Sequence, residues 1–132
     1  MCASGASISA NAVWAARLAH APSSDAPAAV AASVRYGVPV GAHPETLSRI
    51  AEPANGVIPL TEGDALPLGD NPDGSAGWTL RVRFVPGHAP GHLACVDSRY
   101  GAMIVGDMVS SLSSILISPE DGNLGQYMDS LH

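Results

Sequence analysis

The sequence contains no lysine, so its six positive charges are all arginines, and they stand against twelve carboxylates. The net charge of −6 argues against a module that binds nucleic acid through a basic surface. Aromatic residues make up only 5% of the chain, which is too few for a platform that stacks bases. We therefore expect no nucleic-acid partner.

Cysteine and long apolar runs are also scarce. Cys2 and Cys95 are the only cysteines, which excludes a disulfide scaffold, and Cys95 lies in an apolar run where a small buried residue is expected. Free thiols favour a reducing, cytoplasmic location. No window of 18 uninterrupted apolar residues exists, so we expect no transmembrane helix and no membrane partner. The N-terminus also lacks the basic and long apolar regions of a secretory signal.

What is present fits one small domain. The chain has 132 residues, 46% of them hydrophobic, and its 14 glycines and 11 prolines predict many turns. The Ala- and Ser-rich residues 1–25 predict a poorly specified N-terminal segment, followed by one domain over 26–132. Short strands alternate with helices in this domain, which indicates an α+β fold with a mixed, largely antiparallel sheet.

The clearest single element is an alternating strand over 78–85, in which apolar residues occupy every second position. A helix is expected from Pro27 to Tyr36, with Gly37 as its C-terminal cap. Residues 57–60 and 65–68 flank a turn and are expected to pair as a hairpin. The remaining expected elements are strands over 38–42, 93–96, 102–105 and 115–117, a short helix over 44–51, and a helix capped by Asn123 that runs to 132.

Candidate chemistry is concentrated between residues 86 and 107. His88 and His92 lie on a loop stiffened by proline and glycine, directly after the alternating strand. Asp107 follows the next pair of strands. Imidazole and carboxylate groups together suit zinc, manganese or iron. Rigid loops at strand ends commonly carry functional residues, so this stretch is the candidate metal site.

An ordinary structural role is the alternative for each of these residues. A loop with two histidines can be a turn whose imidazoles bond to the backbone, and a Gly-Asp pair can be a cap. We interpret His43, which precedes Pro44, as a cap or packing residue. His20 is expected to be solvated, and Trp14 and Trp78 to anchor the core or an interface. The acidic residues of the turns are expected to be solvated: Asp70, Asp73, Glu120 and Asp121.

Several motifs resemble those of the metallo-β-lactamase superfamily. Residues 85–93, Val-Pro-Gly-His-Ala-Pro-Gly-His-Leu, resemble its His-Thr-Pro-Gly-His element. Residues 104–107, Ile-Val-Gly-Asp, resemble its Gly-Asp element after the next strand pair. The stretches 37–46, 60–66 and 118–127 are similar to the glyoxalase-II-like and ribonuclease-like hydrolase branch. The resemblance covers about residues 28–131 in the right order, and it implies an αβ/βα layered sandwich.

The resemblance also implies roles for three residues. His88 corresponds to a zinc-ligand histidine, and Asp107 to the carboxylate that bridges two metals. His92 corresponds to a residue that is not a ligand, and we expect it to support the loop by hydrogen bonding. The implied cofactor is zinc. The implied activity is hydrolysis of an ester, thioester, amide or phosphodiester bond in a small-molecule substrate by metal-activated hydroxide.

The chain departs from the family's pattern on both sides of this region. The family's His-x-His-x-Asp-His cluster should lie upstream of the helix at 27–36, but residues 1–25 hold only His20 and Asp25, at a different spacing. The family's final ligand should follow the last helix, and His132 does not match its motif. We therefore expect a partial domain, truncated at both ends, that lacks most metal ligands and is inactive as an isolated chain.

Two further hypotheses remain open. The chain is alternatively a non-catalytic remnant or interaction module, whose uncovered apolar faces would lead to self-association. The other hypothesis is that a partner chain supplies the missing half of the metal site.

Overall fold

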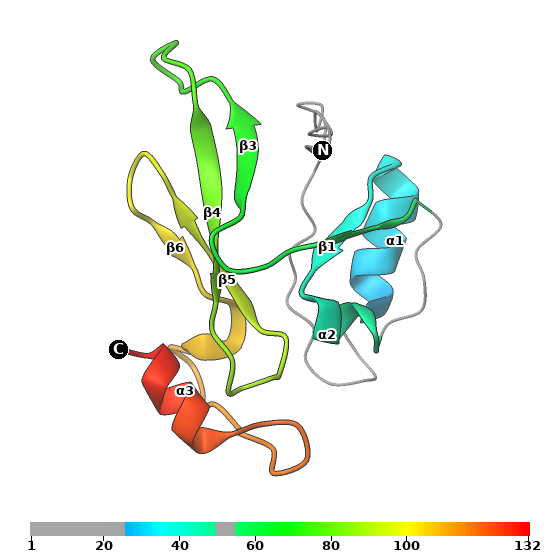
Figure 1. The fold of residues 1–132 in the computed structure, drawn as a ribbon, viewed down its shortest axis with the longest axis vertical. Helices are drawn as coiled ribbons and strands as arrows, with labels where there is room; N and C mark the ends of the chain where they lie inside the picture. The colour runs from blue at the N-terminus through cyan, green and yellow to red at the C-terminus, as the bar shows by residue number, and fades with distance from the viewer. Residues whose placement is uncertain (1–25, 50–54) are drawn as a thin grey trace, which may run out of the picture.

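The computed structural model describes residues 26–49 and 55–132, shown in colour in Figure 1. The expected N-terminal segment 1–25 lies outside the described residues. Cys2, Trp14 and His20 belong to that segment, so their predicted roles lie outside them as well. None of the described helices is both long and apolar enough to cross a membrane.

The described strands form two sheets, which confirms the α+β class. A small parallel sheet consists of β1 (Val40–Ala42) and β2 (Val57–Pro59). A larger sheet has the order β3-β4-β5-β6 and is antiparallel throughout. Its strands are Ala65–Gly69, Trp78–Phe84, Leu93–Asp97 and Met103–Ile104. Parallel and antiparallel pairs therefore both occur, but in separate sheets.

The central strand β4 shows the alternation predicted from the sequence. Val82 is fully buried between the exposed Arg81 and Arg83. Such alternation is typical of a strand with one face on the core and one in water. The core forms where this face meets neighbouring apolar residues, and its buried members are Leu60, Leu66, Val82 and Leu93.

The hairpin predicted from residues 57–60 and 65–68 is wrong. Leu60 N donates to the Ala42 carbonyl, so the first run extends the ladder of β1. The turn that follows is bonded to β4 instead: Gly63 N donates to Val82 O, and Val82 N donates to Asp64 O. The chain therefore crosses from one sheet to the other at this turn, because each run finds its backbone partner in a different strand.

One helix precedes the small sheet in the chain, and a second lies between its two strands. Helix α1 (Ala26–Tyr36) ends as predicted before Gly37, whose φ of +64° suits a glycine cap. Helix α2 (Pro44–Leu47) is shorter than the predicted 44–51, and the last two of those residues lie outside the described part. His43 caps α2 by accepting from Glu45 N at 3.3 Å, and its ring stacks on Phe84 at 4.5 Å. The predicted capping and packing role of His43 is confirmed.

The C-terminal part folds back onto one end of the larger sheet (Figure 1). A short 3₁₀ turn, η1 (Gly106–Met108), follows β6, and helix α3 (Leu124–Ser130) is capped by Asn123 as predicted. Helix α3 ends at Ser130, so its predicted extension to 132 is wrong. The predicted strand over 115–117 is also wrong. Gly122 N donates to Ser118 O, which turns the chain back towards α3 before it can extend along a strand edge.

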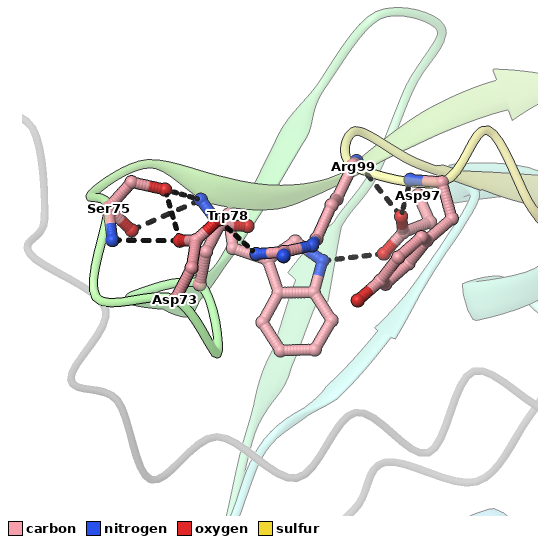
Figure 2. Close-up of polar contacts among 7 residues, drawn as sticks. Asp73, Ser75, Trp78, Asp97 and Arg99 are labelled. Carbon is pink, nitrogen blue, oxygen red and sulfur yellow. Dashed lines mark hydrogen bonds and ion pairs between the residues drawn. The ribbon is translucent and has the colours of Figure 1, made fainter.

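The opposite end of the larger sheet is fastened by a polar group of side chains, which we call the turn cluster: Asp73, Ser75, Trp78, Asp97 and Arg99 (Figure 2). Asp97 accepts from the backbone N–H groups of Arg99 at 2.9 Å and Tyr100 at 2.6 Å, and from Trp78 Nε1 at 2.5 Å. Asp73 forms an ion pair with Arg99 at 3.0 Å. Asp73 is exposed, as expected for a solvated turn residue, and it also joins two turns through Arg99.

Asp121 departs from the same expectation. Its carboxylate accepts from the Arg49 guanidinium at 2.5 Å, so it joins the turn before α3 to the end of α2. Both acidic residues are thus partners of arginines that are far away in the sequence. Turn composition indicates that acidic residues lie in loops, but it cannot show which distant cation the fold brings near.

Candidate metal site

The loop between β4 and β5 is compact and largely buried. Gly87 has a φ of +127°, a conformation that L side chains rarely adopt. Val85 N donates to His92 O at 3.0 Å, and His92 N donates to Ala89 O at 3.2 Å, so the loop closes on itself. The His88 side chain is only 6% exposed. Glycine and the internal hydrogen bonds therefore fix the direction in which His88 leaves the backbone.

Asp107 belongs to η1, and its side chain lies next to that of His88. Gly106, with a φ of +55°, turns the chain sharply after β6. The Asp107 carboxylate is 55% exposed, and its Oδ2 lies 4.0 Å from Nε2 of the buried His88. The fold thus brings together the two residues that the sequence singled out. They line a cavity of about 270 Å³ together with Ser110, Ser113, Ser114, Ile115 and Leu116.

His92 connects the two segments. It is 3% exposed, and its Nε2–H donates to the Val105 carbonyl at 3.1 Å. Its ring stands edge-on to that of His88, with centroids 5.8 Å apart. Burial lowers the pKa of His92, the Val105 hydrogen bond acts in the opposite direction, and the neighbouring His88 lowers it further. The His92 imidazole therefore ties the loop to the residues just before Asp107.

The serines in the cavity were not singled out from the sequence. Ser110 Oγ accepts from Leu112 N at 3.3 Å and Ser113 N at 3.2 Å, which folds the segment after Asp107 into a tight turn. A run with four serines directly behind a Gly-Asp pair is a usable signal, because such runs favour turns at loop surfaces. It does not by itself show that the turn faces a histidine 20 or more residues earlier.

The donor set fits part of a metal site. Zinc binds imidazole nitrogen at about 2.0–2.1 Å and carboxylate oxygen at about 2.0–2.2 Å, so two donors 4.0 Å apart reach one ion almost in line. A tetrahedral arrangement needs them about 3.3–3.4 Å apart, a movement that the exposed carboxylate can make. Within residues 26–49 and 55–132, however, no group of three or more His, Cys, Asp or Glu side chains is placed to hold a metal. Two donors do not complete a catalytic zinc site, which takes three protein ligands.

Comparisons with known proteins identify the architecture. No protein-family model matches the chain, and no curated protein matches it. Among solved structures, TTHA1623 in a di-iron-bound form is similar at a TM-score of 0.60 and 24% identity, over 79% of this chain and 54% of that one. BLEG-1 B3 metallo-β-lactamase is similar at 0.55 and 21%, over 77% and 53%.

A third match, the metallo-β-lactamase family protein TTHA1429 from Thermus thermophilus, has a TM-score of 0.47 and 28% identity, over 83% of this chain and 35% of that one. The chain spans about half the length of the first two structures. The order of elements, the antiparallel sheet and the first two matches agree with one another. The chain therefore has part of the metallo-β-lactamase fold.

Proposed function

We propose that this chain is a metal-dependent hydrolase-type domain in which His88 and Asp107 are ligands of a divalent cation, and His92 holds the loop that carries His88. The observation that carries the proposal is the 4.0 Å approach of His88 Nε2 to Asp107 Oδ2 at the edge of a cavity. A buried imidazole beside an exposed carboxylate offers one fixed donor and one adjustable donor to an ion. TTHA1623, which has a similar fold, is described in a di-iron-bound form, and this supports metal binding as the function of this fold.

We further propose that the described part of the chain does not hydrolyse substrate by itself. The site has two donors, and a catalytic zinc needs three protein ligands with an open position for water. Zinc is the metal we propose, and the substrate class is an ester, thioester or phosphodiester of a small molecule. Both follow from the sequence resemblance around residues 85–107.

Elemental analysis and turnover assays test this proposal. The chain is loaded with zinc, dialysed and assayed with a generic thioester and a generic phosphodiester. We expect fewer than one zinc per chain and no turnover above background. His88→Ala should lower the zinc content further, whereas His132→Ala, the matched change at an exposed histidine, should leave it unchanged. A full zinc complement with turnover that depends on His88 would refute the inactive state, and identical zinc contents in wild type and His88→Ala would refute the site.

An interaction module is the second candidate, and one surface of α3 favours it. Leu124, Met128 and Leu131 follow one another at helical spacing along and just beyond the helix, and are 63%, 47% and 45% exposed. A row of exposed apolar side chains often marks a contact surface. We propose self-association through this row. Light scattering after size exclusion should show an oligomer that Met128→Gln disrupts, and a clean wild-type monomer would rule it out.

A further inference from the structure

Helix α3 contacts both chain segments that carry the His88–Asp107 pair. In Figure 1 it lies beside η1 at the end of the larger sheet where the β4–β5 loop also turns. His88 and Asp107 belong to separate segments, and their side chains are held 4.0 Å apart. The His92–Val105 hydrogen bond joins these segments directly, and helix α3 gives them a second, common support.

On the Asp107 side, the support is one side chain, that of Tyr127. Tyr127 Oη donates to the Met108 carbonyl at 2.7 Å. Met108 directly follows Asp107 and is 3% exposed, so this hydrogen bond holds η1 at a buried point. The turn's own bond, from Met108 N to Val105 O, is longer at 3.2 Å. Because the Asp107 carboxylate is half exposed, its direction depends on how firmly the backbone beneath it is held.

On the His88 side, the support is the backbone of Tyr127. A Cβ placed on Gly87 would clash with Tyr127 N, so the absence of a side chain at 87 lets α3 sit directly on the loop. Asn123 N donates to Gly87 O at 2.8 Å, and Ser130 Oγ donates to Pro86 O at 2.8 Å. Tyr127 therefore touches the residue before His88 with its backbone and the residue after Asp107 with its hydroxyl.

We propose that Tyr127 is a positioning residue: its hydroxyl, held over Gly87 by α3, sets where Asp107 stands relative to His88. The inference deepens the proposed function and rests on it, because the pair matters as a cation site. In this role Tyr127 does not contact the ion itself, but it determines how well His88 and Asp107 can bind one ion together.

Tyr127→Phe is the test, because it removes the hydroxyl and keeps the ring. Ser33→Ala is the matched control, since Ser33 Oγ also donates to a backbone carbonyl, that of Val38, at a buried place in the N-terminal part of the fold. The metal-free readouts are amide hydrogen exchange at Met108 and the NMR signals of Asp107. The metal readout is Co²⁺ affinity, followed through its visible absorption bands.

We expect Tyr127→Phe to speed exchange at Met108, to shift the Asp107 signals and to weaken Co²⁺ binding about 3- to 10-fold, the equivalent of one hydrogen bond. Ser33→Ala should lower the unfolding midpoint without moving any of these readouts. Ser130→Ala, which loosens only the loop side, should shift His88 signals and leave Asp107 in place.

The outcomes separate the two ideas. If His88→Ala binds Co²⁺ as wild type does, the proposed function fails, and the metal-free readouts still decide the role of Tyr127. If Tyr127→Phe leaves the Asp107 signals and Met108 exchange unchanged, the positioning role is overturned. The same holds if Ser33→Ala moves Asp107 and Co²⁺ affinity as much as Tyr127→Phe does, because the effect would then reflect general stability.

Discussion

The two ends of the larger sheet use carboxylates in opposite ways. At the turn cluster, Asp97 accepts three hydrogen bonds from the protein and Asp73 accepts from Ser75 and pairs with Arg99 (Figure 2). At the other end, Asp107 is 55% exposed and its Oδ2 lies 4.0 Å from Nε2 of His88. Carboxylates whose acceptor positions are filled by protein donors hold neighbouring turns together. A carboxylate left facing a cavity beside a buried imidazole can still take a ligand, and this difference assigns one end to structure and the other to the proposed cation site.

The largest expected effect comes from a substitution at the end of the larger sheet that carries the His88–Asp107 pair. Gly87→Ala places a methyl group against the backbone of Tyr127, on a residue with φ of +127°. Since α3 must move or the loop must change conformation, we expect a loss of roughly 3–5 kcal/mol in the free energy of unfolding. Urea unfolding followed by circular dichroism measures it.

The matched change at the opposite end is Gly101→Ala. Gly101 also has positive φ, +66°, but a Cβ there meets nothing within 4 Å. Its cost should be about 1–2 kcal/mol, from backbone strain alone. Equal losses in the two variants would show that α3 does not rest on Gly87.

The next effect compares the two aspartates directly. Asp97→Asn replaces an acceptor that receives three N–H groups, so an amide NH₂ must face a donor, and the midpoint of thermal unfolding should fall clearly. Asp107→Asn should leave the midpoint within about 1 °C, because its carboxylate is half exposed. A larger fall for Asp107→Asn than for Asp97→Asn would reverse the assignment of the two ends.

A pH titration of stability sharpens the same comparison. Hydrogen bonds from Tyr100 N–H and the Trp78 indole hold the pKa of Asp97 below its ordinary value of 3.8. A lowered carboxyl pKa contributes stability above pH 3.8, and that contribution is lost as the pH falls through the lowered value. Wild type should therefore lose stability on acidification below about pH 4, and Asp97→Asn should lose less over the same range. Parallel curves for the two proteins would mean that these hydrogen bonds do not favour the ionised form.

The smallest effect concerns the strand that joins the two ends. Cys95 on β5 is 6% exposed, and burial raises the pKa of its thiol above 9.0. In a Cys2→Ser background, we expect a thiol reagent at about pH 8 to react slowly with the native chain and rapidly in urea. Fast reaction without denaturant would show that the sheet opens locally at its centre.

The sequence predicts much of this fold because the informative patterns are local. The alternation around Val82, the glycine after Tyr36 and the Asn123 cap each act within a few residues, and each appears in the structure. The false hairpin after Val57 shows the limit of local patterns. A turn between two apolar runs predicts pairing, but which strand each run meets depends on edges far away in the chain.

The candidate site divides in the same way. His88 and Asp107 could be picked out because glycine and proline flank them, and the fold brings them within 4.0 Å of each other. Tyr127 ends the stretch 118–127 that resembles the hydrolase branch, but the sequence assigns it no role, because its significance comes from a contact with Gly87 that exists only once α3 has folded back over the loop. Side chains that act through the backbone of another segment leave little local trace in the sequence.

Zinc titration followed by calorimetry is the most direct test of the proposed pair. Metal-free wild type and His88→Ala are titrated under identical conditions, with His132→Ala as the matched histidine control. Because two donors give a weaker site than the three or four of a complete zinc centre, we predict one weak binding event in wild type and in His132→Ala, and none in His88→Ala. Binding of equal strength in all three proteins would contradict the account, because the ion would then be held elsewhere than between His88 and Asp107.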